Sequence, residues 1–329
     1  MILPKSLYYF YDNKWFDSKW QVIDYAHTHG HYSFNINQVR CVLNKDFSFD
    51  KYDWKVEPSK SWEELTLDRM LKIRDTFSKI CLLYSAGSDS HYILTLCLKY
   101  NIKIDEICTI YSGLKSFPND WLNWDMDNVG IPFVKNHASH IPYNIHIIDD
   151  WNKYTDTNVF SFEGLFKDIG VICTAVSTAY PAVVEEYRKK GFICIHGSTE
   201  PNIYYDKDND KYFAEMYDTD NFLDRNTLPN TVAFFTDPSY PEIHIKQCHL
   251  VKNYLRLHNI KNCDGITNYD LFKQIYCALT RDGYRIDKKS PQYVKTVKHH
   301  IFNTKKQEMF FKALYKGNKR SGEQYHYFL

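Results

Sequence analysis

Between residues 79 and 200, short apolar runs alternate with longer segments of helical periodicity, and this alternation constrains the fold more than any other feature. Four runs read as buried strands, at 79–85, 106–113, 144–150 and 192–198, and three segments read as helices, at 90–101, 121–130 and 174–191. Apolar strands separated by helices are typical of a parallel sheet covered on both faces. The sequence therefore predicts a doubly wound, mostly parallel α/β core.

Weaker patterns flank this core and predict three regions. Residues 1–58 read as a small aromatic-rich subdomain, with strand-like runs at 6–12, 14–17 and 38–43 and a helix at 19–28. Residues 59–205 form the predicted α/β domain, and residues 206–329 a mostly helical, basic region for substrate binding or a lid.

The α/β domain is predicted to begin with a helix after residue 60. Ser61 and Glu64 have the spacing of a capping box, which satisfies free N–H groups at a helix start. An apolar side is expected from Leu65, Met70, Leu71 and Ile73. Asp105, further along the chain, is expected in a surface turn.

Composition indicates a globular protein of the cytoplasm. The chain has 329 residues, of which 44% are hydrophobic. Its longest apolar runs are far below the roughly 20 residues that a membrane helix needs, and the first residues lack the pattern of a signal peptide. The nine cysteines form no CxxC pair, which favours buried reduced thiols over disulfides or a zinc site.

Charge is distributed unevenly along the chain. The net charge is +1, yet the segment 285–320 holds eleven Lys and Arg residues and two acidic ones. Such asymmetry often indicates a polyanionic partner, here tRNA or DNA, but a solvated helical face explains the same charges equally well.

The stretch "LLYSAGSDSHYIL", residues 82–94, joins a predicted strand to a predicted helix. Gly87 is expected to allow a tight bend, and Ser85, Ser88 and Ser90 supply hydroxyl groups. Together with the free N–H groups of the helix they would form an anion cradle. Asp89 would repel a phosphate unless a metal lies between them, which implies Mg²⁺. An ordinary Ser/Gly turn before a helix is the alternative.

The motif "SAGSDS" resembles the SGGxDS signature of the PP-loop ATP pyrophosphatases, which share the HUP fold and include asparagine synthetase, GMP synthetase and the PAPS reductase group. In that family the loop holds the β,γ-pyrophosphate of ATP while the α-phosphate is attacked. The resemblance implies that residues 85–90 bind ATP and that Asp89 is catalytic and binds Mg²⁺. Ala86 replaces the second glycine, at a cost of about 1 kcal/mol if the position needs positive φ.

Two further stretches strengthen the resemblance. "ICTIYSG" lies where the family presents its second strand to adenine, so Ile110, Tyr111 and Ser112 are implied base contacts. "GFICIHGSTEPN" resembles the asparagine-synthetase branch, in which Gly197 matches and Glu200 falls near a second metal-binding acid. The lead-in from residue 52 also looks like PP-loop proteins of large bacteriophages, which would place the protein in a host cytoplasm.

Missing motifs narrow the expected reaction. Residue 2 is Ile, where glutamine-using asparagine synthetases carry a catalytic cysteine, and clustered zinc cysteines are absent. What remains is adenylation of a substrate oxygen with release of pyrophosphate, followed by attack of an amine or ammonia. Lys316, Lys319 and Arg320 are expected to neutralise charge on the leaving pyrophosphate.

The sequence leaves several alternatives open for the function, the acceptor and the oligomeric state. The chain could be a catalytically weakened nucleotide- or nucleic-acid-binding protein, or a sulfur-transfer enzyme that uses Cys173 or Cys194. His27, His29 and His31 could bind a metal or end a polar strand. The acceptor could be a small molecule or a nucleic acid, and a homodimer is an open alternative.

Overall fold

We describe a computed structural model of the chain. The residues that the structure describes are 7–16, 22, 25–26, 28–31, 39–43, 49–112, 123–148, 175–197, 202–206, 208–216, 230–237, 239–261, 269–286 and 325–329.

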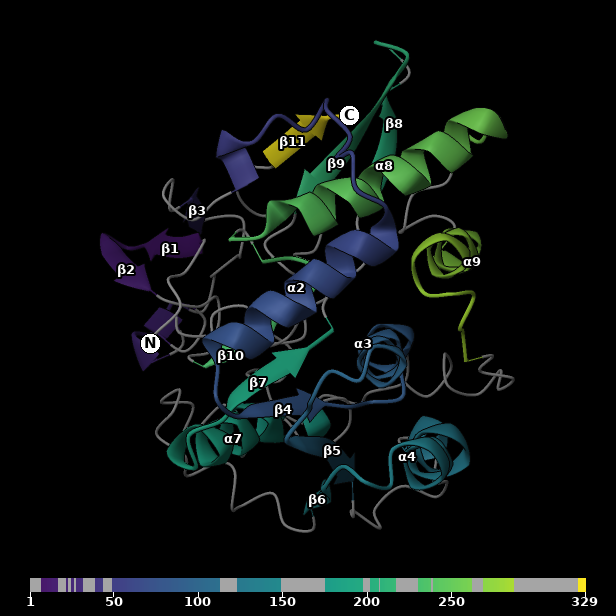
Figure 1. Cartoon of the computed structure of the whole chain (residues 1–329). Helices are drawn as coiled ribbons and strands as arrows, with labels where there is room; N and C mark the ends of the chain where they lie inside the picture. Colours follow the sequence, from purple (N-terminus) through teal and green to yellow (C-terminus); the bar gives the residue numbers. More distant parts are fainter. Residues whose placement is uncertain are drawn as a thin grey trace.

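A five-stranded parallel sheet lies in the lower half of the molecule as drawn in Figure 1. Its strands are β4 (Ile80–Leu83), β5 (Glu106–Ser112), β6 (Tyr143–Ile148), β7 (Ile193–His196) and β10 (Thr231–Ala233), in the spatial order β10-β7-β4-β5-β6. Every neighbouring pair is parallel. The chain builds outward from β4 through β5 to β6 and then returns to β7 on the other side, so the order reverses between β4 and β7. The predicted α/β fold is confirmed.

Helices cover both faces of this sheet, because strands β4 and β7 are buried on both sides. Leu82 packs in one core with α2 (Trp62–Thr76) and α3 (Ser88–Lys99). Cys81, on the opposite face, lies close enough to Tyr187 of α7 (Ala175–Lys189) to raise its pKa. Helix α7 packs against β5, β6 and β7.

Helix α2 and the segment 121–130 agree with the sequence-based prediction only in part. The predicted capping box of α2 is confirmed: the Ser61 side chain accepts from the Glu64 N–H, and the Glu64 carboxylate accepts from the Ser61 N–H. Leu71, however, is 43% exposed, because its neighbour Met70 faces the core. The segment predicted as a helix at 121–130 contains a π-helix, η5 (Met126–Gly130), and continues directly into α4 (Ile131–His137).

The N-terminal residues form a small antiparallel sheet. Its strands are β1 (Leu7–Tyr11), β2 (Lys14–Phe16) and β3 (Arg40–Leu43), in the order β2-β1-β3, followed by a short 3₁₀ turn, η3 (Phe49–Lys51). All three predicted strands are confirmed. Most of the predicted helix at 19–28 lies outside the described residues.

The region after residue 205 contains two long helices, as expected, and three strands that were not predicted. The helices are α8 (Pro241–Leu257) and α9 (Tyr269–Thr280). Strand β9 (Lys211–Met216) lies between β8 (Asn202–Asp206) and β11 (Tyr325–Phe328) and pairs with both in an antiparallel sheet, and β10 joins the central sheet. A three-residue strand is too short to show a period in the sequence.

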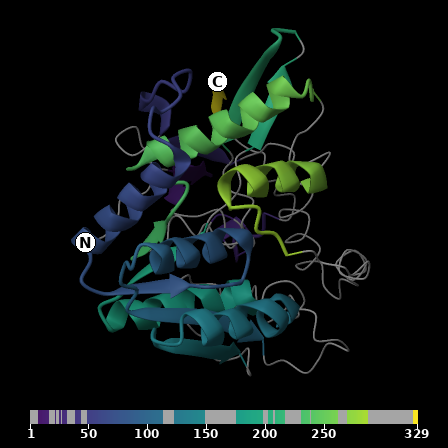
Figure 2. The ribbon, with the colours of Figure 1, turned by 45° about the vertical axis from the view of Figure 1, so that its right-hand side comes forward.

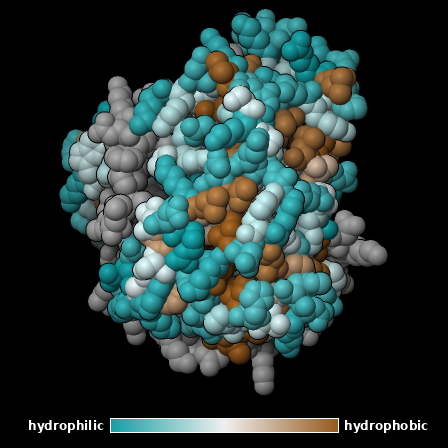
Figure 3. Space-filling view, viewed as in Figure 1, coloured by the Kyte–Doolittle hydropathy of each residue, from teal (hydrophilic) through white to brown (hydrophobic). Residues whose placement is uncertain are grey.

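Figure 2 shows α9 beside α3, on the side of α3 that faces away from the sheet. A second core lies between α8, α9 and strands β8 and β9. The face of the molecule in Figure 3 is mostly hydrophilic, with hydrophobic residues gathered along its middle. None of the described helices is long and apolar enough to cross a membrane.

Candidate active site

The loop that joins β4 to α3 lies where open α/β sheets bind ligands, at the carboxyl ends of the strands and at the point where the strand order reverses. The end of β7 meets this loop. A Cβ atom on Gly197 would lie 2.3 Å from Cβ of Asp89 and 3.0 Å from the Ser90 backbone nitrogen. Only glycine permits this approach, so the structure brings together two of the predicted site residues.

The bend of the loop falls at Ala86 rather than at Gly87. Ala86 has φ 58°, in the left-handed region, whereas Gly87 has φ −62° and an extended backbone. The prediction that Gly87 supplies the tight bend is therefore wrong. The methyl group of Ala86 is fully buried, and a Cβ atom on Gly130 would lie 2.9 Å from it. Gly130 leaves the space in which this methyl group packs.

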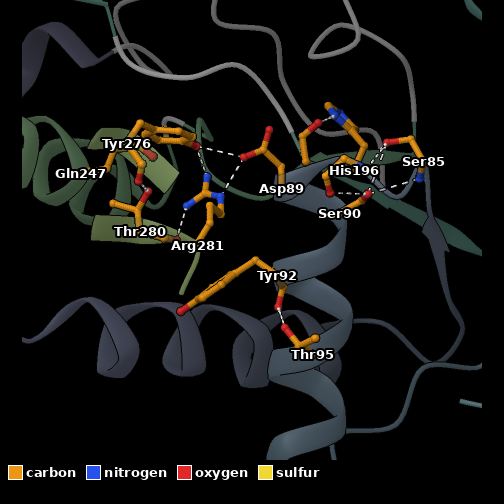
Figure 4. Close-up of polar contacts among 12 residues, drawn as sticks. Ser85, Asp89, Ser90, Tyr92, Thr95, His196, Gln247, Tyr276, Thr280 and Arg281 are labelled. Atoms are coloured by element: carbon orange, nitrogen blue, oxygen red, sulfur yellow. Dashed lines mark hydrogen bonds and ion pairs between the residues drawn. The ribbon is translucent and has the colours of Figure 1, made fainter. Parts of the chain in front are cut away.

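The three predicted serines have different roles in the loop. Ser90 Oγ accepts from the Ser85 N–H at 3.2 Å and donates to the Gly87 carbonyl at 3.2 Å, and it lies 3.3 Å from Ser85 Oγ (Figure 4). Ser88 is 7% exposed, and its Oγ has no hydrogen-bond partner among the described residues. Ser85 and Ser90 therefore hold the loop together, and the buried Ser88 hydroxyl is left without a partner among the described residues.

The start of α3 has a composition suited to an anion. No side chain caps this helix, whose N-cap is Gly87. The first-turn N–H groups of any α-helix have no intrahelical acceptor, and the helix dipole favours negative charge there. The N–H groups of Ser88, Asp89 and Ser90 thus form a donor set of the kind that binds phosphate.

Asp89 is held by two residues at the far end of the chain. Its Oδ1 accepts from Arg281 Nε at 2.7 Å and from the Tyr276 hydroxyl at 2.9 Å (Figure 4). The Arg281 side chain is fully buried, and its guanidinium carbon lies 3.5 Å from the centre of the Phe235 ring. Asp89 is therefore one member of a buried ion pair whose cation is stacked on an aromatic ring.

This ion pair removes the argument by which Asp89 implied Mg²⁺. The carboxylate does not need a metal to offset its charge, because Arg281 already does so. Within the parts of the chain that the structure describes, no group of three or more His, Cys, Asp or Glu side chains could hold a metal ion. Glu200, the predicted second ligand, lies outside the described residues. The predicted role of Asp89 and Glu200 in binding Mg²⁺ stays a prediction.

Sequence reasoning missed Tyr276, Arg281 and Lys273, which all come from α9 or the residue after it. Burial lowers the pKa of Lys273, and the nearby charge of Asp89 opposes this shift. Burial also raises the pKa of Tyr276, so that its hydroxyl stays protonated and donates to Asp89. The signal in the sequence was faint, because only the charged residues Lys273 and Arg281, within and after the largely apolar stretch 269–280, could have pointed to this role.

The segment after α9 supports the loop at a second point. The Tyr284 hydroxyl donates to the Ala86 carbonyl at 3.1 Å, and its ring stacks on His91 with the ring centres 3.6 Å apart. His91 Nδ1 lies 3.0 Å from the Tyr84 hydroxyl. Burial, with a smaller effect of His137, lowers the pKa of His91 to about 4, so the ring is neutral at neutral pH.

The implied adenine contacts lie at the same edge of the sheet. Ile110, Tyr111 and Ser112 end β5, which pairs directly with β4. The Tyr111 hydroxyl donates to the Asp127 carboxylate at 3.0 Å. This position is compatible with a base pocket beside the cradle, and the role of the three residues stays a prediction.

Other predicted residues lie outside the described parts of the chain: Lys316, Lys319, Arg320, Cys173, His27 and most of the segment 285–320. Cys194 is fully buried and lies opposite Cys81 of the neighbouring strand, on the face of the sheet that α7 covers. That position gives no support to a sulfur-transfer role. His31 Nδ1 lies 2.9 Å from the Tyr11 hydroxyl, and His29 stacks on Tyr25.

Comparisons with known proteins give little further information. No protein-family model matches the sequence, and no curated protein is similar to it. Among solved structures, an NH3-dependent NAD synthetase from Campylobacter jejuni subsp. jejuni NCTC 11168, in complex with the nitrate ion, is similar with 13% sequence identity and a TM-score of 0.34. The match covers 77% of this chain and 96% of that chain. A similarity of this size carries no argument about function.

Proposed function

We propose that this chain is a PP-loop ATP pyrophosphatase that activates a substrate oxygen as its adenylate. The observation that carries the proposal is the position of the "SAGSDS" loop. It lies at the reversal of strand order, against Gly197, with the uncapped start of α3 behind it. Serine hydroxyls and helix N–H groups at this place are suited to a polyphosphate.

The proposed reaction has two steps. An oxygen of the acceptor attacks the α-phosphorus of ATP, and the bond between this phosphorus and the α,β-bridging oxygen breaks. Pyrophosphate leaves with the bonding electrons. Ammonia or an amine then attacks the activated carbon, AMP leaves, and the nitrogen loses a proton to solvent. This is the chemistry of an amide ligase, and the match at Gly197 favours the asparagine-synthetase branch.

The residues of the loop would act mainly through charge and position. N–H groups of the first turn of α3 and the Ser88 hydroxyl would hold the pyrophosphate as negative charge develops on it. ATP would arrive as its Mg²⁺ complex, with the metal bound chiefly by the phosphates. Lys316, Lys319 and Arg320 stay proposed as further cations, and Ile110, Tyr111 and Ser112 as contacts of the adenine ring.

The test is pyrophosphate release from Mg²⁺-ATP, with AMP measured in the same samples, in the presence of ammonium and pools of candidate acceptors. Ser88→Ala removes a hydroxyl that has no partner among the described residues, so the fold should keep its stability. We expect it to slow cleavage about tenfold, the effect of losing one transition-state contact. Ser78→Ala, at an exposed position before β4, is the matched control. The proposal would be contradicted if ATP were cleaved to ADP and phosphate, or if no pool of acceptors led to any cleavage of ATP.

A second candidate function is nucleotide binding without turnover. Two features favour this function: an alanine takes the left-handed position of the loop, and Asp89 is occupied by an ion pair with Arg281. A PP-loop with full activity is expected to have a glycine at the first position and an acid that is free to bind a metal at the second. Saturable ATP binding without AMP formation under any condition would identify this function.

A nucleic-acid acceptor is proposed on the charge of segment 285–320 alone. If tRNA or DNA binds there, its dissociation constant should rise steeply with salt, with a slope near the number of phosphates neutralised. A small-molecule acceptor would show no such dependence.

A further inference from the structure

The acid of the loop is neutralised from within the protein. Arg281 donates from Nε to Asp89 Oδ1 at 2.7 Å, and a guanidinium stays charged at every physiological pH. A phosphate that approaches the loop therefore meets a neutral ion pair instead of a bare carboxylate. The repulsion that would otherwise require a metal between Asp89 and the phosphate is offset.

Arg281 is fixed in place by its surroundings. It donates from Nη1 to the Thr280 carbonyl at 2.7 Å, and its side chain is fully buried. Besides Phe235, its guanidinium carbon lies within 5.5 Å of the ring centres of three aromatic residues: Trp62, Tyr92 and Tyr276. Moving Arg281 away would lose these cation–π contacts as well as the ion pair. The cation is thus a permanent part of the loop.

Donors of hydrogen bonds gather at the start of α3, next to this ion pair. The Ser88 hydroxyl is more than nine-tenths buried and has no partner among the described residues. The N–H groups at the start of α3 lie beside it, and Lys273 is close enough to Asp89 for their charges to interact. Donors and cations in this arrangement suit an anion with several phosphate oxygens.

We propose that Arg281 is the built-in counter-charge of Asp89, so that the loop binds a pyrophosphate group directly, without Mg²⁺ between Asp89 and the phosphate. The inference rests on the proposed function, because it assigns the loop to the phosphates of a nucleotide. Arg281 is a positioning residue in this scheme, since it touches Asp89 and not the ligand.

The test is calorimetric titration of inorganic pyrophosphate into the full-length protein, first in EDTA and then in Mg²⁺. We expect the wild-type dissociation constant in EDTA to lie within about tenfold of its value in Mg²⁺. Arg281→Met leaves the Asp89 charge uncompensated, so binding in EDTA should weaken about tenfold or more, the size of one charge contact, and Mg²⁺ should restore it. If Arg281 only stabilised the fold, Arg281→Met would weaken pyrophosphate binding both in EDTA and in Mg²⁺.

Arg188→Met is the matched control, because Arg188 is exposed on α7 and pairs with Glu185 on the same helix. It should leave both dissociation constants unchanged. If Arg281→Met does not fold, Asp89→Asn combined with Arg281→Met removes both charges. That double variant should bind pyrophosphate in EDTA within about tenfold of wild type.

Wild-type binding that occurs only with Mg²⁺ would overturn the inference. A folded Arg281→Met that binds normally in EDTA, or a folded double variant that does not bind, would also overturn it. Cleavage of ATP is not part of this measurement. If the protein binds pyrophosphate without metal but does not cleave ATP, the inference stands and the proposed function is rejected. If the protein cleaves ATP but binds pyrophosphate only with Mg²⁺, the proposed function stands and the inference is rejected.

Discussion

Ala86 carries the bend of the loop in a conformation that costs an L-residue about 1 kcal/mol. Its buried methyl group offsets this cost by a similar amount, because burying one methyl or methylene contributes about 0.8 kcal/mol. The alanine that replaces the family's glycine is therefore close to neutral for folding, and the structure explains why it is tolerated.

We expect Ala86→Gly to change the free energy of unfolding by less than about 1 kcal/mol. Gly130→Ala should cost about 1–3 kcal/mol, because its Cβ would lie 2.9 Å from the Ala86 Cβ and 2.5 Å from Met126 Cε. Ala86→Gly should relieve part of that cost in the double variant. Urea unfolding of the four proteins measures the coupling, and strictly additive changes would contradict the described contact.

Gly197 and Gly87 should respond differently to the same substitution. Gly197→Ala would press a Cβ atom into the backbone of α3, 3.0 Å from the Asp89 carbonyl carbon, so the first turn of the helix must shift. We expect a loss of stability of about 1–3 kcal/mol and weaker nucleotide binding. Gly87→Ala meets only the movable Ser85 Oγ, at 3.3 Å, and should cost less than about 1 kcal/mol. Equal effects in thermal unfolding would show that the two loops are not in contact.

At the scale of elements, Asp105 ties the end of α2 to the start of β4. Its Oδ2 accepts from Arg74 Nη1 at 2.6 Å and from the Ile80 N–H at 2.9 Å, and Lys103 pairs with its Oδ1. Asp105 lies in a bend before β5, as predicted, but its side chain is only 14% exposed and so is largely buried instead of lying at the surface. The ion pair forms because Arg74, in the last turn of α2, reaches the residue that precedes β5.

Asp105→Asn should lower the free energy of unfolding by about 1–3 kcal/mol at neutral pH, the range for hydrogen bonds to a charged group. Asp68→Asn is the control, because Asp68 pairs with an exposed lysine and should cost less than about 1 kcal/mol. Burial raises the pKa of Asp105, but hydrogen bonds from Lys103, Arg74 and the Ile80 N–H outweigh it and lower the pKa to about 2. The Asp105 carboxylate therefore contributes its full stabilisation above about pH 4, near the pKa of this group in the unfolded chain. This contribution to the free energy of unfolding should fade as the pH falls toward 2. A constant difference across that range in urea unfolding would contradict this assignment.

At the scale of the whole molecule, buried neutral histidines link stability to pH. Burial lowers the pKa of both His91 and His244 to about 4, from an ordinary value of 6.5. Below pH 6.5 the unfolded chain binds protons that the folded chain does not, so stability is full above pH 6.5 and falls as pH drops toward 4. Each histidine should contribute a slope of about 1.4 kcal/mol per pH unit in this window.

The measurement is the free energy of urea unfolding between pH 4.5 and 7.5. His91→Gln should reduce the slope by the contribution of one proton, and its own stability at pH 7.5 serves as the reference. A variant with the wild-type slope would show that His91 is protonated in the folded state. The Asp105 contribution falls in a more acidic window, so the two effects can be separated.

Local patterns in the sequence determined the elements between residues 62 and 196. The strand-helix alternation, the capping box of α2 and the loop signature each depend on residues within a few positions of one another, so they are readable without a fold. The tertiary structure alone decided that Arg281 pairs with Asp89, 192 positions away, that β10 joins the central sheet, and that Ala86 takes the left-handed bend. These features come from packing between distant segments, whose free energy no local pattern records. The counter-charge of the loop therefore became visible only once α9 was placed against α3.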